Sequence, residues 1–275
     1  MKSCASPALL ALLVVTLTSS VATAATSYTT DFNLTESPVS EGGAWKQTGL
    51  DWTRIVTTGG IAHGTQTGNG GYDDSYAYLS GFSPDQSASA VVHLDPNINH
   101  ATTHEVEILL RWADSAHTAR GYECNFAYNG QYQDIVRWNG PKSNYTYLVP
   151  TGSAHIPGGL REGDVVSAKI VGNLITTYVN GIEILSVADN VFKDGNPGMG
   201  FWRGAPSGPA NDVAFTRFTA ASLTPASAAV AVPARPSWSG LLWIATFAVA
   251  WRSTRAATSF ATWKSRGSTR TRRGS

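Results

Sequence analysis

The sequence predicts an all-β domain folded as a two-sheet antiparallel jelly-roll sandwich. Three observations predict it: apolar side chains recur at every second position in several segments, no segment of residues 25–220 keeps a helical period, and turn sequences separate the segments. A period of two places alternate side chains on opposite faces of a strand. Many short strands joined by turns are typical of sandwiches and jelly rolls.

Two segments carry the clearest alternation, residues 103–112 (THEVEILLRW) and 120–128 (RGYECNFAY). We expect one face of each strand to enter the core, through Val106, Ile108, Leu110 and Trp112 in the first and Tyr122, Cys124 and Phe126 in the second. We expect the other face to meet solvent, through Glu105, Glu107, Arg111, Glu123 and Asn125. Four more segments are rich in β-branched and aromatic residues and predict further strands: 87–94, 164–171, 174–180 and 212–219.

The turns between these segments are rich in Gly, Asn and Pro. Asn180-Gly181 joins two strand-like segments and predicts a two-residue type I′ hairpin, because both of its central positions need positive φ. Four other sequences predict turns: Asn69-Gly70-Gly71, Asn129-Gly130, Pro157-Gly158-Gly159 and Gly195-Asn196-Pro197-Gly198.

The first 24 residues are typical of a secretory signal peptide, with Lys2, an apolar run from Leu9 to Leu17 and small residues at Ala22-Thr23-Ala24. The sequence therefore predicts a secreted or cell-surface protein. Of the two cysteines, Cys4 lies in this segment. The exported chain keeps only Cys124 and forms no intramolecular disulfide.

The C-terminal part differs from the domain in composition. Residues 221–237 are rich in Ala, Ser and Pro, as linkers are. Residues 238–275 hold a short apolar segment, 241–251, followed by seven basic residues and no acidic one. This order resembles the tripartite sorting tails of some exported bacterial proteins, and a disordered extension is the alternative. Membrane contact is expected only through this tail.

Charge is distributed unevenly along the chain. Residues 25–220 hold 11 Lys and Arg against 19 Asp and Glu, so the domain carries about −8 although the whole chain carries +1. Such a domain repels polyanions, so we expect no nucleic-acid partner. Glycans are the partners that we expect.

Residues 161–219 contain a recognisable succession of motifs: Gly163-Asp164, Tyr178-Val179-Asn180-Gly181 and Gly195-Asn196-Pro197-Gly198-Met199-Gly200-Phe201. This succession resembles the C-terminal half of laminin G-like, concanavalin A-like domains. The resemblance extends over about residues 25–220 and implies a jelly roll. It implies no single function, because this superfamily includes lectin-like modules, hydrolases and lyases.

The hydrolases of this superfamily carry Glu-x-Asp-x-x-Glu or Glu-x-Asp-x-Glu on one strand. This chain has Glu105-Val106-Glu107-Ile108-Leu109, without the central Asp and with Leu109 at the second acid position. A polysaccharide-degrading enzyme that uses Glu105, Glu107 or Glu123 therefore stays an alternative. A solvated strand face, partly paired with Arg111, explains the same acids without catalysis. The strand motifs of alginate lyases are absent.

The leading hypothesis is a non-catalytic, carbohydrate-binding or adhesion module, and a structural surface or matrix protein is a further alternative. Aromatic faces beside polar groups suit sugar rings. The candidate binding residues are Trp112, Asn125, Tyr128, Tyr132, Arg137, Trp138, Trp202 and Arg203. We expect no cofactor and find no metal-binding motif, although Asp73 and Asp74 are candidates for a structural calcium.

Overall fold

The computed structural model describes residues 26–67, 74–98, 103–204 and 211–224. Within these ranges the chain forms strands and no helix, which confirms the predicted fold class. The predicted signal peptide, the C-terminal tail, Asp73 and the turn at 69–71 lie outside the described residues. The last strand ends at Ser222, so the folded part continues into the first residues of the predicted linker.

The strands are β1 (Ser27–Thr30), β2 (Ile55–Thr58), β3 (Ile61–Gly64), β4 (Ser75–Tyr78), β5 (Gln86–Leu94), β6 (His104–Ser115), β7 (Thr118–Ala127), β8 (Gln133–Gly140), β9 (Tyr145–Tyr147), β10 (Val165–Val171), β11 (Leu174–Val179), β12 (Ile182–Ala188), β13 (Asn196–Arg203) and β14 (Val213–Ser222). The segments predicted as strands form β5, β6, β7, β10, β11, β12 and β14, and seven further strands among the described residues complete the domain.

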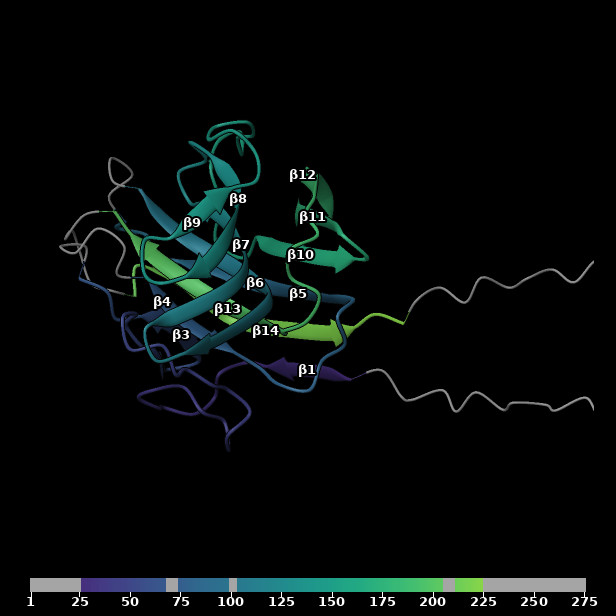
Figure 1. The fold of residues 1–275 in the computed structure, drawn as a ribbon. Coiled ribbons are helices and arrows are strands. Elements are labelled where there is room, and N and C mark those ends of the chain that lie inside the picture. Colours follow the sequence, from purple (N-terminus) through teal and green to yellow (C-terminus); the bar gives the residue numbers. More distant parts are fainter. Residues whose placement is uncertain (1–25, 68–73, 99–102, 205–210, 225–275) are drawn as a thin grey trace, which may run out of the picture. The chain divides into compact units, whose positions relative to one another are not determined.

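Two antiparallel sheets form the domain. The six-stranded sheet has the order β4-β13-β6-β7-β8-β9. The eight-stranded sheet has the order β12-β11-β10-β5-β14-β3-β2, with β1 added against β14. Figure 1 shows β6 and β13 lying over β5 and β14, so the central strands of the two sheets are stacked. This two-layer jelly roll is the architecture that the resemblance to concanavalin A-like domains implies.

The main core fills the space between the sheets. Tyr122, Cys124 and Phe126 of β7 are fully buried there, as the alternation predicts. Val106, Ile108 and Leu110 of β6 belong to the same buried cluster. Because the six-stranded sheet already buries one face against the other sheet, the residues between these positions lie on its outer face.

Trp112 was expected in this core and lies on the outer face instead. The pairing of β6 with β7 shifts between Leu110 and Ala113, and Arg111 has a φ of 48°. This bulge reverses the alternation, and Trp112 packs against Tyr76 on the outer face, with 4.6 Å between ring centroids. Gly121 faces the bulge, where a Cβ would lie 2.8 Å from Trp112 Cα.

The Asn180-Gly181 hairpin is confirmed. Asn180 and Gly181 have φ values of 51° and 77°, as a type I′ turn requires, and they join β11 to β12. Among the described residues no helix has the length and apolar character needed to cross a membrane.

Candidate carboxylate site

The outer face of the six-stranded sheet brings polar side chains from three neighbouring strands into one row. Glu107 of β6 pairs in register with Gly200 of β13 on one side and with Asn125 of β7 on the other. Asn125 in turn pairs with Asp134 of β8. Side chains directly opposite on neighbouring strands have Cβ atoms about 4.5–5.5 Å apart, so these groups are neighbours on one surface.

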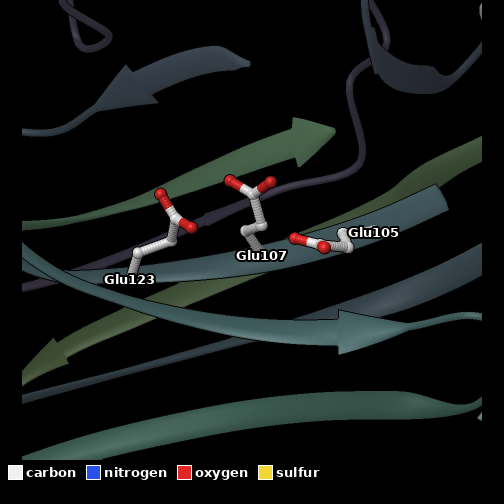
Figure 2. Close-up of side chains that lie close together, drawn as sticks. All are labelled: Glu105, Glu107 and Glu123. Carbon is white, nitrogen blue, oxygen red and sulfur yellow. The ribbon is translucent and has the colours of Figure 1, made fainter. Parts of the chain in front are cut away.

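Glu105, Glu107 and Glu123 come together on this face and are buried. Their exposed fractions are 7%, 0% and 4%, and one carboxylate oxygen of each lies within 4.8 Å of the others. Figure 2 shows Glu107 between the carboxyl groups of Glu105 and Glu123. The expectation of a solvated acidic face was wrong, because an aromatic cluster covers this face of the sheet.

Arg111 does not neutralise these acids. Its guanidinium donates hydrogen bonds to the backbone carbonyls of Pro84, Phe192 and Gly172, and it pairs with Asp85 at 3.4 Å. The bulge at this residue turns the side chain away from the glutamates. The expected pairing of Arg111 with the strand's acids was therefore also wrong.

Glu123 is the acid whose anion receives the most hydrogen bonds. Its Oε2 accepts one from the Tyr76 hydroxyl at 2.5 Å and one from the Trp138 indole N–H at 2.6 Å. Burial raises the pKa of Glu123, and the hydrogen bonds from Tyr76, Trp138 and Asn125 oppose that rise. Donors to a carboxylate favour its charged form, so Glu123 is the best stabilised anion of the three.

Glu105 has a different environment. It accepts one hydrogen bond, from the Tyr132 hydroxyl. Burial, with smaller contributions from Glu123 and Asp134, raises the pKa of Glu105 to about 8, although the Tyr132 bond acts in the opposite direction. At neutral pH this side chain is therefore mainly a carboxylic acid that can donate a proton.

Glu107 has no hydrogen-bond partner within the described chain, and both of its carboxylate oxygens are buried. Burial, followed by the charges of Glu123, Asp74 and Glu105, raises its pKa well above the usual range. Gly200 provides the space for this group, because a Cβ there would lie 2.1 Å from Glu107 Oε2. We infer that Glu107 is held as a neutral acid, and it is not among the described residues that line the pocket over Glu105 and Glu123.

A half-open pocket of about 130 Å³ lies over Glu105 and Glu123. This volume is below the range of about 300–1,000 Å³ that is typical of sites for whole small ligands, so the pocket has room for only part of a larger ligand. Aromatic side chains form much of its wall, and acidic and amide groups form its floor. The described lining residues are Asp74, Glu105, Glu123, Asn125, Tyr132, Val136, Trp138, Tyr145, Tyr147 and Trp202.

The structure brings together four of the eight predicted binding residues, Asn125, Tyr132, Trp138 and Trp202. The other four lie elsewhere. Trp112 is buried in the aromatic cluster, Tyr128 stacks on His104 in the interior, Arg137 pairs with Asp189, and Arg203 pairs with Asp212. Whether the four pocket residues bind a ligand stays a prediction.

Sequence reasoning did not single out Tyr76, Tyr145 or Tyr147 for this site. Tyr145 and Tyr147 are two apart on the short edge strand β9, so they lie on the same face and both reach the pocket. This spacing was a usable signal. No comparable sequence signal pointed to Tyr76, because Tyr76 reaches the site only through the pairing of β13 with both β4 and β6.

The three glutamates are also the described group whose spacing could hold a metal ion. Asp74, a calcium candidate from the sequence, is 5% exposed, lines the pocket and has its Oδ2 3.0 Å from the Tyr76 hydroxyl oxygen. Hard cations prefer such oxygen ligands. The same crowding of acids is equally typical of carboxyl groups that retain protons.

No protein-family model matches the chain, and a comparison with curated protein sequences gives no match. Solved structures do resemble it. The carbohydrate-binding module CBM66 from Bacillus subtilis has a TM-score of 0.46 and 13% identity, and the alignment covers 68% of this chain and 96% of that one. A glycoside hydrolase family 16 endo-glucanase from Bacteroides ovatus has a TM-score of 0.44 and 12% identity, with coverages of 70% and 98%.

A kappa-carrageenase from Zobellia galactanivorans is similar at a TM-score of 0.42 and 10% identity, over 71% of this chain and 93% of that one. Similarities of this size carry no argument about what this chain binds or cleaves. The class that the fold and site define is a jelly-roll domain with an aromatic pocket over a buried carboxylate cluster.

Proposed function

We propose that this domain binds a glycan chain in the pocket and hydrolyses a glycosidic bond, with Glu105 as the general acid and Glu123 as the nucleophilic carboxylate. The observation that carries the proposal is the contrast between these two neighbouring carboxyl groups. Burial raises the pKa of both groups, but Glu123 accepts hydrogen bonds from Tyr76 and Trp138 that oppose the rise, whereas the pKa of Glu105 reaches about 8. Two neighbouring acids whose environments favour the charged form to different degrees suit glycoside hydrolysis, which needs one acid and one carboxylate.

The spacing of the acids favours a covalent mechanism. The nearest oxygens of the cluster lie within 4.8 Å of one another, close to the separation of about 5–5.5 Å in retaining enzymes. Glu105 donates its proton to the leaving oxygen while Glu123 attacks the anomeric carbon. Glu105 then removes a proton from water, which attacks the same carbon and releases Glu123. The sugar keeps its anomeric configuration.

The aromatic wall supports a glycan as the substrate. Tyr132, Trp138, Tyr145, Tyr147 and Trp202 surround the acids. Flat rings stack on the apolar faces of sugars, while carboxylate and amide groups accept hydrogen bonds from hydroxyls. The predicted export of the chain agrees with an extracellular polysaccharide as its partner.

Glycan binding without cleavage is the second candidate function. It is favoured by the same aromatic wall, which needs no catalysis to hold a sugar. Two measurements separate the candidates: reducing-end release from a panel of soluble polysaccharides, and binding of those polysaccharides by the Glu123→Gln variant. Cleavage by the wild type and binding without cleavage by the variant support hydrolysis. Binding by both proteins without cleavage contradicts hydrolysis and supports an adhesion module.

A further inference from the structure

The proposed hydrolysis uses Glu105 and Glu123 and leaves three further acids at the site without a role. Asp74 lines the pocket, Asp134 lies beside Asn125, and Glu107 lies between the two catalytic glutamates. Asp74 and Asp134 are 5% and 1% exposed. Five buried acids in one place are costly unless protons or a positive charge compensates them.

No described residue that lines the pocket is Lys, Arg or His. The two buried arginines nearest in sequence to the site, Arg111 and Arg203, pair with Asp85 and Asp212. The described lining therefore supplies no positive charge to the pocket acids. Protons on Glu105 and Glu107 compensate part of the cost, and a positively charged ligand would compensate the acids that stay ionised.

Asn125 gives a second, independent indication of what such a ligand offers. It is not an acid, it is 8% exposed, and it lines the pocket. Its amide hydrogen-bonds Glu123, whereas its Oδ1 has no partner in the described structure. Asp134 Oδ1 beside it is also unpaired. A buried acceptor without a donor costs about 1–3 kcal/mol, so these oxygens favour a ligand that donates hydrogen bonds.

An ammonium group has three donors and no acceptor, and it carries a positive charge. A sugar hydroxyl supplies one donor and no charge. The unpaired nitrogens of Trp52 and Trp112 lie in the aromatic cluster and not in the pocket lining. Asp134 is not among the described residues that line the pocket, so the unpaired acceptor of the lining is Asn125 Oδ1, which suits a ligand that donates hydrogen bonds.

We propose that the glycan recognised in this pocket carries a protonated amino group, as in a polymer of 2-amino-2-deoxy sugars, held by Asp74, Asn125 and the neighbouring carboxylates. This inference rests on the proposed function and names its substrate class. The aromatic wall contacts the sugar ring, and the acidic floor of the pocket favours a positively charged sugar over a neutral or negatively charged one. N-acetylation removes the charge, and uronic acids or sulfated sugars are repelled.

The test compares β-1,4-linked oligomers of equal length made of glucosamine, N-acetylglucosamine, glucose or glucuronic acid, at a pH below the pKa of the sugar amine. Calorimetry measures binding, and product release is measured in the same samples. We expect the glucosamine oligomer to bind at least about tenfold more tightly than the glucose oligomer, and the glucuronic acid oligomer not to bind.

Asp74→Asn should reduce the ratio of glucosamine-oligomer affinity to glucose-oligomer affinity several-fold. Glu183→Gln removes one negative charge from an exposed residue of β12, in the other sheet and outside the pocket lining, and should leave the preference intact. Thermal melting checks that both variants fold, and the wild-type comparison needs no variant. If neutral or N-acetylated oligomers bind as tightly as the glucosamine oligomer, the inference is overturned while the proposed function stands. If none of the oligomers or soluble polysaccharides binds, both are overturned.

Discussion

Leu109 of β6 and Glu123 of β7 are directly paired across the six-stranded sheet. The hydrolases that the sequence resembles carry a second acid at the position that Leu109 occupies here. In this chain the neighbouring strand supplies a carboxyl group at the same level of the sheet. Leu109 is apolar and fully buried beside it. The proposed pair of acids therefore lies on two neighbouring strands.

This pairing makes Glu123 the residue whose loss should affect catalysis most. Glu123→Gln keeps a side-chain oxygen that accepts the bonds from Tyr76 and Trp138, so the fold should be retained. We expect the hydrolytic rate to fall by about 10²–10⁴-fold or more, with glycan binding changed far less. Reducing-end assays and calorimetry measure the two effects. Hydrolysis at the wild-type rate in this variant excludes Glu123 as the nucleophile.

Glu105 should set the high-pH limit of activity. Its pKa of about 8 keeps it protonated below that pH, and deprotonation removes the general acid. We expect the kcat/KM of the wild type to decline as the pH rises through about 8. The Glu105→Gln variant should have little activity, and its remaining kcat/KM should not decline in this pH range. A substrate whose leaving group needs no proton should restore the first step in this variant. An unaltered alkaline limb in Glu105→Gln would falsify the assignment.

Trp138 should act as a positioning residue for Glu123. Its indole N–H lies 2.6 Å from Glu123 Oε2 and lowers the pKa of that carboxyl group. Trp138→Phe removes this donor and keeps an aromatic ring. The pKa of Glu123 should then rise, so that the low-pH limb of the activity profile moves to higher pH. Tyr145→Phe, at another ring of the wall, serves as the control and should not move this limb.

The buried acids should make the domain less stable as the pH rises. A carboxyl group with a raised pKa in the folded state binds more protons folded than unfolded, so the unfolding free energy decreases with pH above the unfolded pKa of about 4.3. For Glu105 this loss continues up to about pH 8. Glu107→Gln should flatten the curve and raise Tm at alkaline pH by about 2–4 °C or more. An equally steep decline in the variant contradicts a raised pKa for Glu107.

Gly200 should tolerate no larger side chain. A Cβ at this position would lie 2.1 Å from Glu107 Oε2 and 2.9 Å from Tyr76 Cδ1. We expect Gly200→Ala to destabilise the domain by about 1–3 kcal/mol through overpacking. Adding Glu107→Asp, which shortens the clashing side chain, should recover part of the loss in a double-mutant cycle. Denaturant unfolding measures both variants, and strictly additive effects contradict the clash.

The sequence alone determined the central strands β5, β6, β7, β10, β11 and β14 and, apart from Trp112, the inward faces of β6 and β7. Alternation in residues 120–128 placed Tyr122, Cys124 and Phe126 in the core, and Asn180-Gly181 specified its hairpin, because these features depend on neighbours within a few residues. The same alternation correctly assigned Glu105, Glu107 and Glu123 to the opposite face.

Tertiary structure decided what that face became. The bulge at Arg111 turns Trp112 outward, and the order of β4, β13, β6, β7 and β8 places Tyr76, Glu107, Asn125 and Asp134 in one row. Alternation of apolar residues with a period of two indicates which face of a strand a residue occupies. It does not indicate which strands pair with that strand or which side chains cover that face. The burial of the three acids and their different hydrogen bonds arise only from those long-range neighbours.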